Sequence, residues 1–268
     1  MRRRLLILAL LASPSLVFAQ ESDEEWLEHC TNGRWNGRRP TACDVRVQTL
    51  PRRDVLRVRP GQNGGVHIIA DDRSDVEVHT RLQASADSRN DANSTLRGIN
   101  VDLGSTLSAS GPGRDMDGGW SVSFVIYVPR NTNLDLETHN GPIAVKQVVG
   151  RMELSAQNGP ISLSGVGGEV RAETQNGPLQ VRLTGNRWNG AGLDAETRNG
   201  PIQVAIPEGY NAMLETGTVN GPMQTDFPIT MTLNGRMSWK RFTTKLGDGG
   251  APVRVVTTNG PVTLSRRN

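Results

Sequence analysis

The second half of the chain alternates apolar and polar residues around one tripeptide, Asn-Gly-Pro, which occurs six times. Positions two, four and six before each asparagine, and three and five after it, are apolar or threonine. This period of two predicts half-buried strands, so each repeat is predicted to be strand, corner, strand. The spacings of 18, 18, 23, 21 and 39 residues, the last about two periods, define a repeat array. Its corner asparagines are Asn140, Asn158, Asn176, Asn199, Asn220 and Asn259.

The proline decides between two kinds of turn. Asn-Gly between alternating segments ordinarily indicates a two-residue hairpin, but Pro lacks the N–H that such a turn uses, and it drives the preceding residue toward extended backbone angles. A corner of a β-solenoid accommodates the tripeptide better, with Gly supplying an unusual backbone angle and the asparagines stacking at about 4.8 Å. The predicted fold is therefore an all-β, β-solenoid or β-helix-like array. A row of ligand-binding amides is the alternative role for the asparagines.

The remaining chain divides into three predicted segments. Residues 1–19 have the form of a signal peptide, with Arg2–Arg4, a short apolar run, and a cleavage site before Gln20. Residues 20–43 form an N-terminal segment, residues 44–130 a less regular β region, and residues 131–268 the repeats. Asn63-Gly64-Gly65 is predicted to be a seventh, variant corner. The segment 30–43 and the chain after Pro261 are expected to cap the two ends of the array; failed capping would allow self-association.

Charge and composition exclude several classes of protein. Removing the three leader arginines reduces 30 basic residues to 27, against 27 acidic ones, so the mature chain has no excess positive charge for a nucleic-acid partner. After leader cleavage no apolar stretch is long enough to cross a membrane. An exported protein is expected, in the periplasm, outside the cell or on its surface. Aromatic residues make up only 4%, which is typical of thin aliphatic layers.

Two cysteines, Cys30 and Cys43, enclose twelve residues. In an oxidising compartment they are predicted to form a disulfide, which stabilises the fold by about 3 kcal/mol in the chain-entropy model. The alternative is a metal site that combines both thiolates with His29, but neither cysteine belongs to a C-x-x-C pair. No metal, cofactor or catalytic residue is predicted.

Two further patterns are candidates for ligand contact. Glu173 and Glu196 occupy equivalent outward positions of successive repeats, where they could share a cation or act as the carboxylate pair of a glycosidase. Arg171 between charged neighbours instead favours an ordinary ladder of ion pairs. Trp35 and Trp188 lie in two copies of Arg-Trp-Asn-Gly. Exposed, they could stack on a sugar; the alternative is that they cover an open edge.

The stretch Ile126–Pro129, the segment Leu134–Gly141 with its Thr-x-Asn-Gly corners, and Arg187-Trp188-Asn189-Gly190 resemble a bacterial family, the putative adhesins. That family is a domain of unknown function with strand repeats and Asn-Gly corners, and the resemblance runs from about Cys43 to the C-terminus. It implies a non-enzymatic surface or binding module, whose partner would be an envelope glycan or an envelope protein. The alternatives are a carbohydrate-active solenoid enzyme and an envelope-stress accessory protein that binds a sensor domain.

Overall fold

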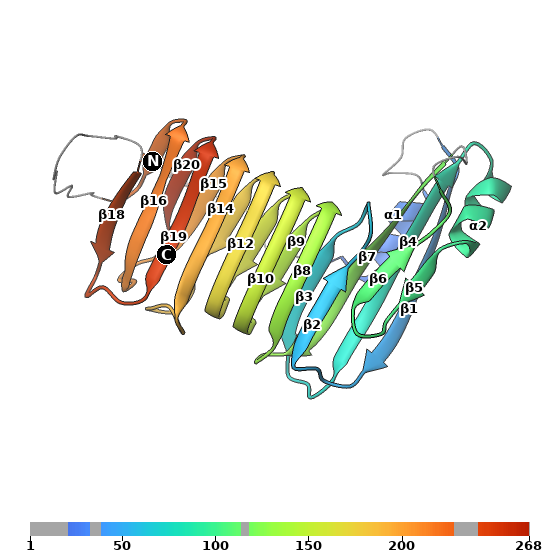
Figure 1. Cartoon of the computed structure of the whole chain (residues 1–268), viewed down its shortest axis with the longest axis horizontal. Coiled ribbons are helices and arrows are strands. Elements are labelled where there is room, and N and C mark those ends of the chain that lie inside the picture. The colour runs from blue at the N-terminus through green and yellow to red at the C-terminus, as the bar shows by residue number, and fades with distance from the viewer. Residues whose placement is uncertain (1–20, 33–38, 114–117, 228–240, 268) are drawn as a thin grey trace, which may run out of the picture.

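The computed structural model describes residues 21–32, 39–113, 118–227 and 241–267; the predicted leader and Trp35 lie outside these ranges. Within them, the strands form two ten-stranded sheets of mixed direction, seen as two layers in Figure 1. The all-β prediction is confirmed. In spatial order, sheet A contains β1 (Thr41–Leu50), β4 (Val76–Ala86), β7 (Gly118–Pro129), β3 (Val66–Asp71), β9 (Ile143–Lys146), β11 (Ile161–Ser164), β13 (Leu179–Arg182), β15 (Ile202–Pro207), β20 (Val262–Arg267) and β17 (Met223–Thr225).

Sheet B lies opposite sheet A, and each repeat adds one strand to each sheet. In spatial order, sheet B contains β18 (Arg241–Leu246), β16 (Ala212–Asn220), β19 (Pro252–Asn259), β14 (Gly192–Asn199), β12 (Gly167–Asn176), β10 (Val149–Asn158), β8 (Asn133–Asn140), β2 (Val55–Arg59), β6 (Leu107–Ser110) and β5 (Asn100–Asp102). Strands of adjacent repeats pair in parallel, so the tripeptides are corners between sheets and no hairpin forms at them.

The corner asparagines stack in register. Each amide nitrogen donates to the carbonyl oxygen of an asparagine in the adjacent repeat, over 2.8 to 3.1 Å. The first member is Asn63, so the predicted variant corner belongs to the stack. Proline has no N–H to donate, but no donor is needed there, because the hydrogen bonds between strands use the Pro carbonyl as acceptor. The Ile161 N–H, for example, donates to the Pro178 carbonyl.

The predicted unusual backbone angle occurs at two corner glycines, Gly64 and Gly260, with φ of 143° and 155°, and a second reason for glycine applies at all the corners. Gly159, Gly177 and Gly200 do not have left-handed backbone angles. Instead, a Cβ atom on Gly177 would lie 2.1 Å from the carbonyl oxygen of Gly159 in the adjacent repeat, and the other corner glycines meet the same obstacle. The stacking distance of the backbones therefore excludes any side chain.

A single core fills the space between the sheets. The inward positions of the two sheets, such as Leu154 and Ala172 opposite Leu163 and Val181, are at most 3% exposed. Burial of each such leucine or valine contributes about 1.5–3 kcal/mol. Residues from before and after position 130 share this core, and β2 and β3 pair with β8 and β9. The domain boundary near 130 stays a prediction.

The C-terminal repeat lies inside the array, which corrects one expectation. β19 pairs with both β14 and β16, and β20 pairs with both β15 and β17, so the last repeat in the sequence is inserted before the fifth. Accordingly, Asn259 accepts from Asn220 and donates to Asn199. The chain after Pro261 therefore does not cap the array; that end consists of β17 and β18.

Two helices lie near the other end of the array, where β1 is the edge of sheet A. Helix α1 (Asp23–Thr31) begins with a capping box between Ser22 and Glu25 and packs against β1. Helix α2 (Arg89–Arg97) buries Ala92 against Ala42 and Ala86 of β1 and β4. Neither helix is long and apolar enough to cross a membrane, in the ranges described.

Candidate functional site

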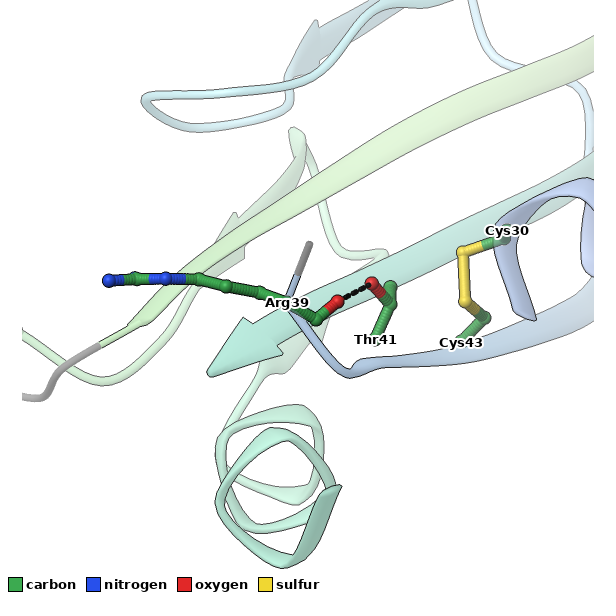
Figure 2. The surroundings of a disulfide bond; sticks show 4 residues. All are labelled: Cys30, Arg39, Thr41 and Cys43. Atoms are coloured by element: carbon green, nitrogen blue, oxygen red, sulfur yellow. Dashed lines mark hydrogen bonds between the residues drawn. A yellow bond between two sulfur atoms is a disulfide. The ribbon is translucent and has the colours of Figure 1, made fainter. Parts of the chain in front are cut away.

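The disulfide fixes α1 to the edge of sheet A. Cys30, near the end of the helix, is bonded to Cys43 of β1 (Figure 2), and Thr41 donates to the Arg39 carbonyl beside it over 3.2 Å. This pairing leaves no thiolate for the alternative metal site, and His29 contacts Glu21 instead. The described ranges contain no group of three or more His, Cys, Asp or Glu side chains arranged to hold a metal ion.

Beneath α1, charged side chains connect the helix to the outer face of sheet A. Asp23 binds Arg81 at 2.9 Å and His79 Nδ1 at 2.5 Å, while His79 Nε2 lies 2.9 Å from Glu77. Burial alone would lower the pKa of His79, but its hydrogen bonds to Glu77 and Asp23 outweigh burial and raise it. These contacts are internal to the fold and hold the helix in place.

The outer face of sheet B carries the carboxylates singled out from the sequence. Glu173 and Glu196 are direct neighbours in the register of β12 and β14. Each is neutralised by its own arginine, since Arg171 lies 2.5 Å from Glu173 and Arg254 lies 3.2 Å from Glu196. The hydrogen bond to Glu173 raises the pKa of Arg171. The two carboxylates are therefore members of an ion-pair ladder, and each has one oxygen bound by an arginine that would compete with a shared cation.

The same ladder continues along sheet B in both directions. Arg254 lies 2.5 Å from Asp194 and 3.4 Å from Glu215, so one cation serves three carboxylates. Burial would lower the pKa of Arg254, but the bonds to Asp194 and Glu196 raise it. Near the other end, Arg59 binds Asp135 at 2.6 Å. Most polar groups on this face are thus satisfied by the protein itself.

The outer face of sheet A has a column of a different kind. Between the buried positions of successive strands, uncharged polar side chains pair in register from β11 to β17, in the order Ser162, Gln180, Gln203, Thr263 and Gln224. They are partly or fully exposed. Over the part of the chain that the structure describes, none of these five side chains has a hydrogen-bond partner. We call these five residues the amide–hydroxyl column.

The sequence contained the signal for this column. The residue four places after each corner asparagine is uncharged in all six repeats, whereas outward positions before the corner carry most of the charge. A second feature was also missed: threonines two places before the asparagine are buried. Thr174, Thr197 and Thr257 donate to the carbonyl of a corner glycine in the adjacent repeat, over 2.8 to 3.0 Å.

The tryptophan of the second Arg-Trp-Asn-Gly motif does not form a sugar platform. Trp188 is 5% exposed, and its indole N–H donates to the Gly168 carbonyl at 3.0 Å. With its ring buried in the core and its donor used, it cannot stack on an external glycan; it covers the core beside the repeat that has the 23-residue spacing. The hypothesis of an exposed aromatic contact at Trp188 is therefore wrong.

No protein-family model and no curated protein matches the sequence. Solved structures do resemble the fold. A putative cell adhesion protein from Clostridium sporogenes matches 84% of this chain and 100% of its own, with 10% identity and a TM-score of 0.44. A putative adhesin from Bacteroides fragilis matches 84% of this chain and 97% of its own, with 8% identity and a TM-score of 0.32. A putative lipid binding protein from Parabacteroides distasonis matches 83% of this chain and 97% of its own, with 10% identity and a TM-score of 0.27.

Within the chain itself, the features that could meet a partner are the two outer faces. They have the same strand spacing of about 4.8 Å, and they differ in whether their polar groups are already paired. Only the amide–hydroxyl column presents a continuous run of uncharged donors and acceptors whose partners must come from outside the described residues.

Proposed function

We propose that this chain is an exported, non-enzymatic β-solenoid that binds an uncharged polysaccharide of the cell envelope along the outer face of sheet A. The amide–hydroxyl column is the observation that supports this proposal. Amides and hydroxyls repeated in register offer both donors and acceptors, which neutral sugars require. Because the column carries no charge, it does not attract ionic ligands in preference to neutral ones.

Export is part of the proposal. It is supported by the leader-like residues 1–19 and by a disulfide, which is typical of oxidising compartments. The predicted organisation follows, with a cleaved leader, an N-terminal segment over 20–43, an irregular region over 44–130 and repeats over 131–268. An envelope protein or a second copy of the chain is the partner to consider if no glycan binds.

The experiment is co-sedimentation of the exported chain, from residue 20 onward, with insoluble envelope polysaccharides. A double substitution in the amide–hydroxyl column, Gln180→Ala with Gln203→Ala, should lower the affinity for polysaccharide about tenfold. The reason is that each lost hydrogen bond contributes about 0.5–1.5 kcal/mol. The matched control is Glu173→Gln with Glu196→Gln on sheet B, which should leave retention unchanged. Thermal unfolding of both double variants checks that the fold is intact.

Other outcomes would identify another function. Release of soluble sugar that Glu173→Gln or Glu196→Gln abolishes would establish the glycosidase alternative. Equal loss of retention in both double variants would show that binding is not specific to sheet A. If no polysaccharide retains the chain, adhesion to sugar is wrong, and cross-linking in cells is the next measurement, since it would identify a protein partner such as a sensor domain.

A further inference from the structure

A cavity of about 300 Å³ lies between the two sheets at the C-terminal end of the array. It forms because sheet A ends in a short strand. β17 stops at Thr225, opposite Leu264, whereas its neighbour β20 continues to Arg267. Sheet B extends further at the same end, because β18 pairs with β16 along six residues. The cavity lies at this step between the two sheets, at the end of the array where Figure 1 shows β16 and β18.

The cavity lining is nearly as polar as it is apolar, and its most buried part is apolar. Leu214 and Leu264 form its base and are 1% exposed, while Phe227, Phe242 and Leu246 are half-buried around it. Aromatic and branched aliphatic side chains of this kind line most small-molecule sites, and a volume near 300 Å³ is at the lower end of their range. At about 30 Å³ for each displaced water, the space accepts roughly ten non-hydrogen atoms.

One buried polar group lines this space. Tyr210 is 3% exposed, and burial raises its pKa to about 12. Its hydroxyl has no hydrogen-bond partner among the described residues and is not fully enclosed, since Thr218 Oγ1 is the one fully buried side-chain oxygen or nitrogen there that lacks a partner. A ligand oxygen in the cavity would satisfy this donor.

Positive charge lies at the cavity mouth. Arg266 occupies the inward parity of β20 after Val262 and Leu264, and its partner in register on β15 is the buried Ile206. Its guanidinium lies 5.4 Å from the centroid of the Phe227 ring and 3.9 Å from Glu208, which is largely exposed. Lys245 adds a second cation. The lining thus has two positive charges and one negative charge.

The geometry points to a binding site for a monoanionic amphiphile with a medium-length acyl chain, such as a fatty acid or one chain of an acidic lipid. The acyl chain fills the space between Leu214, Phe242 and Leu264, and the acidic head group binds Arg266 and the Tyr210 hydroxyl. A second copy of this chain fits less well, because the feature is concave and has a cation at an inward position. This site is separate from the proposed polysaccharide face.

The experiment is calorimetric titration of the purified chain with octanoate, decanoate, laurate and myristate, each below its critical micelle concentration. The affinity should rise about fourfold for each added methylene until the cavity is full and should then level off. The uncharged alcohol dodecanol should bind at least about tenfold more weakly than laurate, since it lacks the charge-assisted bond to Arg266.

Substitutions locate the binding. Arg266→Gln should lower laurate affinity at least about tenfold and leave dodecanol unchanged. The matched control is Arg267→Gln, the adjacent cation, which does not line the cavity. Tyr210→Phe keeps the ring and should lower laurate affinity by a smaller factor than Arg266→Gln does. Retention on polysaccharide should be the same in all three variants, which separates this proposal from the proposed function.

Three results would overturn the amphiphile site. The first is affinity that rises with chain length and never levels off, as in adsorption to a surface. The second is a loss of laurate affinity in Arg267→Gln equal to that in Arg266→Gln, which would indicate only a general attraction of anions. The third is a sedimentation coefficient that changes with Arg266→Gln while laurate affinity does not, because the open end would then be a contact between copies of the chain.

Discussion

The outer faces of sheets A and B are built from the same repeats, yet their polar groups are used differently. On sheet B, arginines bridge carboxylates of adjacent strands, as Arg254 does between Asp194 and Glu215. On sheet A, the amide–hydroxyl column from Ser162 to Gln224 has no internal partners among the described residues. Sheet B thus uses its outer polar groups to connect adjacent strands, and under the proposed function the unpaired groups of sheet A bind a ligand.

The corner connects the two faces, so a change there should have the largest effect. In Gly177→Ala, the added Cβ would lie 2.1 Å from the Gly159 carbonyl, which is backbone and cannot move aside. We expect a loss of about 3 kcal/mol in the free energy of unfolding, measured with urea, and weaker retention on polysaccharide through sheet A. The control is Gly119→Ala, where a Cβ meets nothing within 4 Å and the change should be below about 1 kcal/mol. A stable Gly177→Ala would contradict this account of the corner.

Much of the fold could be predicted from the sequence because its signals are local. Alternation around Asn158 or Asn176 defines the two strands of a repeat, and the proline excludes the hairpin. The position of the last repeat could not be predicted in this way. Every repeat has the same pattern of apolar residues at its inward positions, so no residue near Asn259 indicates that it lies between Asn199 and Asn220. That choice is made by the pairing of β19 with β14 and β16, both of which lie earlier in the chain and are separated from it by other elements.

The candidate sites were less predictable, for two physical reasons. For Trp188 the sequence left two alternatives, an exposed sugar contact and the covering of an edge, and only tertiary packing shows that it is buried. Glu173 and Glu196 were correctly expected to be neighbours, since register follows from the repeat. Glu173 is paired with Arg171 of its own strand, but Glu196 depends on Arg254, which comes from the displaced last repeat and could not be assigned to it from spacing. The cavity near Tyr210 depends on the short length of β17, which no local pattern indicates.

A change on sheet B alone should have an intermediate effect. Arg254→Gln leaves Asp194, Glu196 and Glu215 without their shared cation. We expect a loss of about 1 kcal/mol in unfolding free energy at low salt, falling at molar salt because the remaining repulsion is screened.

Arg171→Gln is the comparison for this variant, since Arg171 is more exposed than Arg254 and should contribute less. Polysaccharide retention through sheet A should not change. A loss that is independent of salt would show that Arg254 acts through packing of its side chain and not through charge.

The smallest effect is expected at the one part of the sheet A outer face where internal ion pairs connect a helix to the sheet. His79 lies between Asp23 of α1 and Glu77 of its own strand, and it packs edge-on against the Tyr127 ring. Its folded pKa is raised above the unfolded value of about 6.5, because the hydrogen bonds to the two carboxylates outweigh burial. The stabilisation is thus fully present below about pH 6.5 and is lost as pH rises through the folded pKa.

Urea unfolding across this pH range should show a fall in stability for the wild-type chain that His79→Gln lacks, and the fall should be smaller than the effect of Arg254→Gln. Both Asp23 and Arg81 remain paired in that variant, so α1 should stay docked and the disulfide intact. His139→Gln, on β8 of the other sheet, is the control and should keep the wild-type pH dependence. If His79→Gln retains the fall, another group that titrates in this range is responsible, and α1 is held to sheet A by the Arg81 pair and the disulfide alone.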